Sequence, residues 1–303
     1  MTTVDDTTSP EDTRCWTTRL TEHEVTGKAL MGPAHAISAC GVFFLALGVY
    51  TYRGNDMPLE SNLALLTLSF IAVIGGVLIP DLDNNRSTVE KALGFTGNFF
   101  SAIFRESSRL IQKTVRTSRD DADPNPHRGF WHTIVGACVL GVILWSMTLI
   151  PWVFTIPFIG HKITVGTLCA FVVLVGCFNI TIAGLGYDVF SKKMEKIPVV
   201  GNIASVLMSL VLTGMLLFIA PETNFVWLGV SVAIGCIIHI LGDALTKAGV
   251  PIFFPVIGVI KGKMWWKTRF TSLSADSAVL NGSIYWLSIV ATVIGITLIV
   301  LSL

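Results

Sequence analysis

The chain has 303 residues, of which 52% are hydrophobic and 14% are charged, with a formal net charge of +1 and a mean hydropathy of +0.70. A soluble globular domain usually has about 25% charged residues. This composition excludes an ordinary soluble domain and is typical of a polytopic membrane protein. The balanced charge provides no broad basic surface, so we expect no nucleic-acid partner.

The first 30 residues are polar and rich in Thr, Asp and Glu, with no apolar run of the kind found in signal peptides. We therefore predict a polar cytoplasmic tail at 1–30 and one membrane-embedded domain at 31–303. A helix that crosses a bilayer needs about 20 apolar residues. The sequence predicts an all-α, polytopic helix bundle with seven such spans, at Ala34–Tyr52, Asn62–Pro80, Phe130–Phe154, Ile163–Leu185, Val199–Ala220, Asn224–Leu245 and Ser283–Leu303.

The distribution of basic residues predicts the orientation of these spans. If the N-terminus is cytoplasmic, only Arg53 and Lys162 of the 21 basic residues fall in connections on the opposite side. Lys and Arg accumulate in cytoplasmic loops. The asymmetry therefore favours seven spans, with the N-terminus inside and the C-terminus outside.

The longest predicted cytoplasmic connection, 84–126, is expected to contain an amphipathic helix. Its apolar side consists of Phe99, Phe100, Ile103, Phe104, Leu110, Ile111 and Val115, and its basic side of Arg105, Arg109, Lys113 and Arg116. Such a helix is expected to lie on the lipids of the anionic inner leaflet. Packing on the bundle's own cytoplasmic surface is the alternative. A second apolar segment, 250–260, is too short to span and predicts a re-entrant or interfacial element.

Ionisable side chains are few in and beside the spans, and they gather at one depth. Seven of them lie at span ends on the predicted cytoplasmic side: His35, Asp81, Asp83, His127, His132, His239 and Asp243. Such groups are costly in a membrane and usually serve function there. Four histidines and three aspartates at one depth predict a bound divalent ion, with Zn²⁺ favoured and Mn²⁺ or Mg²⁺ as alternatives.

Two pairs among these residues have spacings that suit metal binding. His239 and Asp243 are four residues apart, which puts an imidazole and a carboxylate on one helix face. Asp81 and Asp83 flank a single residue at the end of the second span. One of these carboxylates could bridge two ions, or could orient a ligating histidine without touching the metal.

The remaining pair, His127 and His132, has an arginine between its members in the sequence. Arg128 lies between His127 and His132, where its guanidinium could hold a phosphate or a carboxylate. Each motif taken singly is also compatible with a helix terminus, an interfacial anchor or a hydrogen-bonded pair in the core. Only their conjunction at one membrane surface predicts a metal site.

These motifs resemble those of a known family, the LexA-regulated, membrane-bound metal-dependent hydrolases of bacteria, or YdjM-type inner-membrane proteins. The matching elements are Gly-x-x-His at Gly32–His35, Ile-Pro-Asp-x-Asp at Ile79–Asp83, His-Arg-Gly-x-x-His at His127–His132 and His-x-x-x-Asp-x-x-Thr-x-x-Gly-Val-Pro at His239–Pro251. The resemblance extends from Met31 to about Trp286. The chain departs from the family pattern at Trp131, where Thr is common, and at Asn84, where His is frequent.

The resemblance implies a metal-dependent hydrolase in the bacterial inner membrane, with water activated by the metal as nucleophile. It also implies that Asp276 takes the place of a glutamate that usually precedes the last span. Asp83 or Asp276 is then the expected general base, and Arg128 the group that holds the anion. The ligand order is also similar to that of zinc-dependent phospholipase C and related nucleases. This similarity implies phosphoester hydrolysis. A site at headgroup depth, beside a basic interfacial helix, favours an amphiphilic substrate such as a phospholipid.

Two other functional classes remain open. A transporter would need ionisable groups near the bilayer midplane and usually an inverted repeat, whereas these groups lie at one surface. A structural or signalling protein could use the metal as a helix clamp, although seven candidate ligands exceed the four of a closed structural site. The oligomeric state is left open by the sequence.

Overall fold

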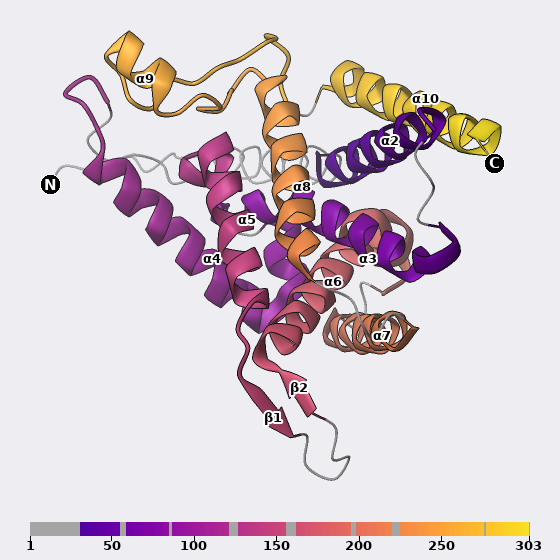
Figure 1. Ribbon diagram of the computed structural model, residues 1–303. Helices are drawn as coiled ribbons and strands as arrows, with labels where there is room; N and C mark the ends of the chain where they lie inside the picture. Colours follow the sequence, from indigo (N-terminus) through magenta and orange to yellow (C-terminus); the bar gives the residue numbers. More distant parts are fainter. Residues whose placement is uncertain are drawn as a thin grey trace, which may run out of the picture.

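The computed structural model describes residues 31–54, 59–84, 87–120, 127–155, 162–194, 198–219, 225–275 and 277–302. The predicted tail at 1–30 and the predicted base Asp276 lie outside these residues. The helices are α2 (Met31–Tyr52), α3 (Leu59–Leu78), α4 (Thr88–Thr114), α5 (Ile134–Thr148), α6 (Val165–Met194), α7 (Pro198–Ile219), α8 (Val226–Ala244), α9 (Val256–Lys261) and α10 (Ala278–Ser302). Two 3₁₀ turns, η1 (Ile79–Asp83) and η2 (Phe130–His132), and a hairpin of β1 (Val153–Thr155) and β2 (Lys162–Thr164) complete the described fold (Figure 1).

Five of the helices are long and apolar enough to cross a membrane. They cover Gly32–Tyr52, Leu63–Asp83, Val165–Ile182, Val226–Ala244 and Ala278–Ser302, and so coincide with five of the predicted spans. Two shorter apolar helices, Ile134–Thr148 and Ile203–Ile219, lie within the other two predicted spans. The chain is therefore an all-helical membrane protein, apart from the hairpin, in the part that the structure describes.

The third predicted span, 130–154, contains a shorter helix than its hydropathy indicates. Helix α5 begins at Ile134 because the Thr133 side chain caps it by accepting a hydrogen bond from the Gly136 N–H. It ends at Thr148, before Pro151, and the chain then enters the hairpin. Capping and proline thus set the helix bounds, which hydropathy alone does not define.

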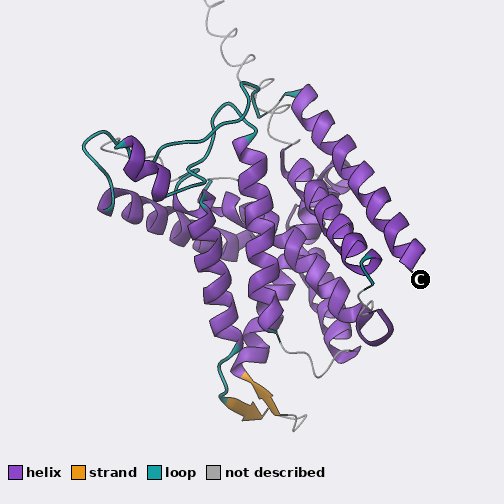
Figure 2. Cartoon of the chain, turned by 45° about the horizontal axis from the view of Figure 1, so that its top comes forward, coloured by secondary structure: helices purple, strands orange, loops and turns teal. Residues whose placement is uncertain are grey.

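Helix α8 lies at the centre of the bundle and packs on α3 and α5 through small residues (Figures 1 and 2). A Cβ added at Gly141 of α5 would lie 2.8 Å from the Gly229 carbonyl oxygen of α8. On the other side of α8, Gly235 rests on the backbone of Val73 and Gly76 of α3. Small residues let membrane helices approach closely where lipid supplies no hydrophobic drive. This packing fixes the α8 face that carries His239.

Helix α10 packs on α2 at the edge of the bundle (Figure 2). A Cβ at Gly41 of α2 would meet the Ser288 backbone of α10, with 2.8 Å to its carbonyl oxygen. One heptad further along, Gly48 and Gly295 oppose each other in the same way. Two close backbone contacts therefore join α10 to the helix that carries His35.

One face of α4 packs against the protein through one aromatic and three polar side chains at helical spacing. Ser101, Phe104, Ser108 and Gln112 are all buried on this face. Ser101 donates a hydrogen bond to the Leu82 carbonyl oxygen in η1, and the Phe130 N–H in η2 donates to Ser108. Helix α4 therefore holds both 3₁₀ turns.

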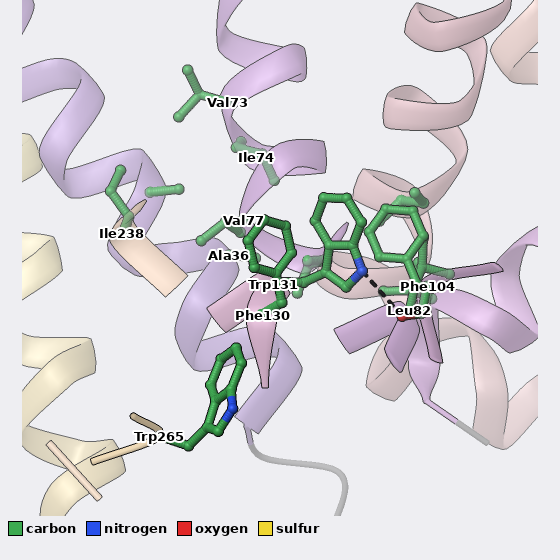
Figure 3. Packing of buried hydrophobic residues seen from close by; sticks show 14 residues of the cluster. Ala36, Val73, Ile74, Val77, Leu82, Phe104, Phe130, Trp131, Ile238 and Trp265 are labelled. Atoms are coloured by element: carbon green, nitrogen blue, oxygen red, sulfur yellow. Dashed lines mark hydrogen bonds between the residues drawn. The ribbon is translucent and has the colours of Figure 1, made fainter. Parts of the chain in front are cut away.

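The aromatic part of this contact is the pair Phe104 and Trp131, whose ring centroids are 4.6 Å apart (Figure 3). The Trp131 indole N–H donates to the Phe104 carbonyl oxygen at 3.0 Å. Phe99, Phe100 and Leu110 of the same helix are exposed. The predicted apolar side of α4 is thus divided between the protein and its surroundings, and its placement at the lipid interface stays a prediction.

Candidate metal centre

Four segments bring seven ionisable side chains together at one end of the bundle. Helix α2 supplies His35, η1 supplies Asp81 and Asp83, the segment that ends in η2 supplies His127 and His132, and α8 supplies His239 and Asp243. They form three overlapping groups that could each hold a metal ion, with the ligand atoms of each group within 4.8 Å of one another. His132 and His239 each belong to two groups.

The local sequence explains how η1 presents two carboxylates. Pro80 occupies the start of the turn, and α3 ends before it because proline cannot donate to the preceding helical turn. The Asn84 N–H closes η1 by donating to the Asp81 carbonyl oxygen at 3.0 Å. The tight turn brings Asp81 and Asp83 into the groups of His239 and His132, respectively.

The centre of the cluster is the contact between His132 and His239. Their Nε2 atoms are 3.2 Å apart. Asp243 Oδ2 lies 3.5 Å from His132 Nε2 and 3.7 Å from His239 Nε2, and Asp81 Oδ1 lies 3.7 Å from His239 Nε2. A tetrahedral ion bound at about 2.0–2.1 Å separates its donor atoms by roughly 3.3–3.4 Å. The observed separations therefore suit donor atoms that share one ion.

The chemistry of the donor set also fits a cation. Asp243 Oδ2 is buried and makes no hydrogen bond, although buried polar atoms almost always have a partner. It faces two imidazole nitrogens that are acceptors whenever their protons are on Nδ1. Apart from the Arg128 guanidinium, whose Nε lies 3.1 Å from this oxygen, the atoms around this point present lone pairs that repel one another unless a cation lies between them. The residues present therefore fit a divalent metal.

Asp83 lies behind the histidines. Its Oδ1 is hydrogen-bonded to His127 Nδ1 at 2.9 Å. Its Oδ2 is 3.1 Å from His132 Nδ1 but poorly aligned for a hydrogen bond, so we describe this contact as an ion pair. A carboxylate on Nδ1 of a histidine whose Nε2 faces the ligand cluster is the usual outer partner of a metal-binding histidine.

The charge around His132 is strongly negative. Asp83 Oδ2 lies 3.1 Å from His132 Nδ1, and Asp243 Oδ2 lies 3.5 Å from His132 Nε2. A positive charge is therefore favoured at this position. A protonated His132 or a bound cation would satisfy the same field.

His35 adds a third imidazole beside Asp243. Its Nε2 is 3.6 Å from Asp243 Oδ1, and its ring centroid is 4.3 Å from that of His239. The ring fits because residue 242 is glycine: a Cβ there would lie 2.7 Å from His35 Cε1. Gly242 thus makes room for a ligand from another helix.

Arg128 is engaged with α8. Its Nε is 3.1 Å from Asp243 Oδ2, and its Nη2 donates to Asp243 Oδ1 at 3.2 Å. Its Nη1 donates to the Thr246 hydroxyl at 2.9 Å, and that hydroxyl donates to the Asp243 carbonyl oxygen. The Arg128 backbone has a φ of 59°, which is uncommon for a residue other than glycine. Strain of this kind is found where surrounding contacts fix a side chain.

The cluster is buried but has one accessible side. His132 and His239 have no exposed surface. The side chains of Asp81 and His127 are 24% and 28% exposed. Asp81 and His127 are therefore the members of the cluster nearest to its surroundings.

One of three comparisons with known proteins found a match. The family model described as "YdjM inner membrane protein" matches residues 30–190 and 203–303. This chain belongs to the YdjM inner membrane protein family. No curated protein and no solved structure matched it. The match covers all four segments of the YdjM cluster, and the resemblance inferred from the motifs is confirmed.

The structure of this chain brings together all seven residues that the sequence proposed as ligands. It also gives two neighbours a part that the sequence analysis did not assign. Thr246 holds Arg128, and Gly242 admits His35. Thr246 belongs to the His-x-x-x-Asp-x-x-Thr motif, and its position one helical turn after Asp243 could have indicated this contact. No sequence signal indicates the Gly242 contact, because it depends on how α2 crosses α8.

Proposed function

We propose that this YdjM family protein is a membrane-bound metal-dependent hydrolase that acts on a phosphoester at the cytoplasmic face of a bacterial inner membrane. The observation that carries the proposal is the convergence of the Nε2 atoms of His132 and His239 on the carboxylate of Asp243. Such a set of nitrogen and oxygen donors suits Zn²⁺, and also Mn²⁺. The seven-span arrangement and the interfacial position of α4 belong to the same proposal.

Each residue has a part in this proposal. His132, His239 and Asp243 would hold the ion, with His35 beside Asp243 and Asp81 facing the remaining position, and Asp83 would orient His127 and His132. A bound divalent ion would supply Lewis-acid activation of water.

Two further groups are required for hydrolysis, a proton acceptor and a group that binds the anion. Asp81 is the carboxylate at the accessible side of the cluster, and it adds to the earlier candidates Asp83 and Asp276 as a proton acceptor. The Asp83 oxygens are both occupied by histidines, so Asp83 is better suited to orientation than to proton transfer. Arg128 would steady the anionic group of the substrate.

The accessible side of the cluster favours hydrolysis over a structural clamp. A structural zinc site is closed by four protein ligands, whereas a catalytic site keeps one position for water or substrate. Asp81 and His127 leave this cluster open on one side. Because the cluster lies at the ends of spanning helices, an amphiphilic phosphoester such as a phospholipid can reach it from the lipid headgroup region.

The first test is the metal content of the protein purified in detergent, measured by elemental mass spectrometry. We expect one or more equivalents of zinc or manganese, lost in a His239→Ala/Asp243→Asn double variant and kept in Glu106→Gln. Glu106 is an exposed carboxylate of α4 that forms an ion pair with Arg109, and it is not one of the cluster residues. No bound metal in a folded preparation, even after addition of divalent ions, would overturn the proposal.

The second test separates catalysis from clamping. The metal-loaded protein is assayed on bis(p-nitrophenyl) phosphate and on a fluorescent phospholipid in mixed micelles. We expect turnover that chelation abolishes and metal restores. Bound metal that raises the unfolding temperature but supports no turnover on either substrate would favour the structural or signalling alternative.

A further inference from the structure

A short apolar helix beside the metal centre exposes its hydrophobic side. Phe253, Val256, Val259 and Ile260 follow one another at steps of three, three and one, so they share a face of α9 and the turn before it. The Ile257 N–H donates to the Phe253 carbonyl oxygen, so the turn that contains Phe253 is joined to the first turn of α9. Val256, Val259 and Ile260 are 63–70% exposed. With six residues, α9 is too short to span a bilayer.

The opposite side of this segment is firmly attached to the protein. Phe254 stacks on Trp265 with ring centroids 4.4 Å apart and an interplanar angle of 7°. The Trp265 indole N–H donates to the Gln112 carbonyl oxygen at the end of α4. Asp120 accepts hydrogen bonds from the backbone N–H groups of Met264 and Trp265, at 3.0 and 3.1 Å. The exposed apolar face is therefore held outward by a built scaffold.

Cations surround the apolar face. Between residues 250 and 273 the sequence has Lys261, Lys263, Lys267 and Arg269 and no acidic residue. The Lys261 ammonium lies 5.6 Å from the centroid of the exposed Trp266 ring. An apolar face with a basic border and an amphipathic tryptophan is the composition of an element that lies in a lipid interface.

The position of α9 along the bundle suits the same environment. It lies beyond the C-terminal end of the spanning helix α8 and next to the end of α4 (Figures 1 and 2). An antiparallel bridge between Val250 and Thr268, and a hydrogen bond from the Phe270 N–H to the Ala244 carbonyl oxygen, tie the segment to the end of α8. Where a spanning helix ends, the membrane surface begins.

We propose that this α9 surface, formed by Phe253, Val256, Val259, Ile260, Lys261, Trp266 and Lys267, inserts into the headgroup region of an anionic lipid leaflet. The occupant is lipid because the segment 250–273 that forms this surface has four cations and no acidic residue, and anionic headgroups complement such a charge. The proposal does not depend on catalysis at the metal centre.

The segment before α9 contacts the residues on either side of His132. The Ile134 N–H, two residues after His132, donates to the Ile252 carbonyl oxygen. Phe254 contacts the ring of Phe130 edge-on, with centroids 6.3 Å apart. Two contacts therefore join the segment before α9 to the chain on either side of His132.

The test uses the full-length protein in nanodiscs whose phosphatidylglycerol fraction is varied against phosphatidylcholine. The Trp266 signal is the difference in emission between the wild type and Trp266→Phe. We expect quenching of this signal by lipids brominated near the headgroup, increasing with phosphatidylglycerol, and protection from aqueous iodide. In Lys261→Gln/Lys267→Gln, the phosphatidylglycerol fraction at half-maximal quenching should rise several-fold.

The control variant is Arg53→Gln/Lys162→Gln, which removes two exposed cations from other connections and should leave the Trp266 signal unchanged. Val259→Asp/Ile260→Asp should abolish the quenching while a native-like unfolding transition is kept. A Trp266 signal that iodide quenches in every lipid would overturn the proposal. So would a second protein copy that covers α9, detected as a dimer in detergent that Val259→Asp/Ile260→Asp dissociates.

Discussion

Replacing Asp83 by asparagine keeps the size of a buried side chain and changes one of its acceptor oxygens into a donor. Asp83 is 1% exposed and lies against Nδ1 of both His127 and His132. An ionised carboxylate only accepts, so it favours the tautomer with the proton on Nδ1 in both rings. The Nε2 lone pairs are then available for a metal.

An asparagine can accept from only one of the two histidines. If its NH₂ group faces His132, the favoured tautomer of that ring places the proton on Nε2, which is the atom 3.2 Å from His239 Nε2. Loss of an outer carboxylate partner typically lowers metal affinity about 10–100-fold. This corresponds to about 1.4–2.7 kcal/mol of binding free energy. We expect Asp83→Asn to weaken Zn²⁺ binding by this amount and to keep its stoichiometry.

The assay is competition for Zn²⁺ between the detergent-purified protein and a chromogenic chelator at neutral pH. His239→Ala, which removes a donor atom at the centre of the cluster, should lose measurable binding, and Glu106→Gln should match the wild type. Circular dichroism verifies that each variant is folded. Wild-type affinity in Asp83→Asn would refute the orienting role, and loss as complete as in His239→Ala would make Asp83 a direct ligand.

Three further changes test other parts of the structure. Partial burial raises the pKa of Asp120, but hydrogen bonds outweigh it and hold this pKa below its ordinary value of 3.8. Near neutral pH, Asp120→Asn should therefore lower the free energy of unfolding by about 1–2 kcal/mol, measured as a lower unfolding temperature. That difference should shrink as the pH falls below 3.8 and disappear below the lowered pKa of Asp120, where wild-type Asp120 is itself protonated. Gly242→Ala should push the His35 ring away, cost about 1–3 kcal/mol and weaken metal binding in the chelator assay. Gly295→Leu, against the Phe44 backbone, should lower the unfolding temperature and leave metal stoichiometry intact, because α10 supplies no ligand.

The helices could be predicted from the sequence because lipid imposes a simple rule on length and polarity. The predicted span Asn224–Leu245 became α8 (Val226–Ala244), and Ala34–Tyr52 became α2 (Met31–Tyr52). The same rule says little about segments outside the bilayer. Ser108 and Gln112 of α4 are buried, although they are polar, because the Gln112 side chain donates to the Ser108 hydroxyl, which also accepts from the Phe130 N–H of η2.

The membership of the candidate site could be predicted because ionisable groups are rare in this sequence. Their pairing could not, because it depends on the crossing of α2 over α8 and on the path of the segment before η2. His35 reaches Asp243 only through the space at Gly242, and Asp83 turns toward the histidines because η1 is a 3₁₀ turn. Spacing along a chain contains neither of these facts.

Arg128 can both bind an anion, as the sequence predicts, and hold residues of α8, as the structure shows. The sequence favoured an anion-binding role, and the structure places its Nε and Nη2 on Asp243 and its Nη1 on Thr246. A guanidinium has five N–H donors, so these three contacts leave one N–H on each terminal nitrogen. Arg128 can therefore hold a carboxylate of the cluster and keep two N–H donors for an incoming phosphate, a group that arginine binds well. The φ of 59° at Arg128 lies in the turn before η2 from which the guanidinium reaches α8.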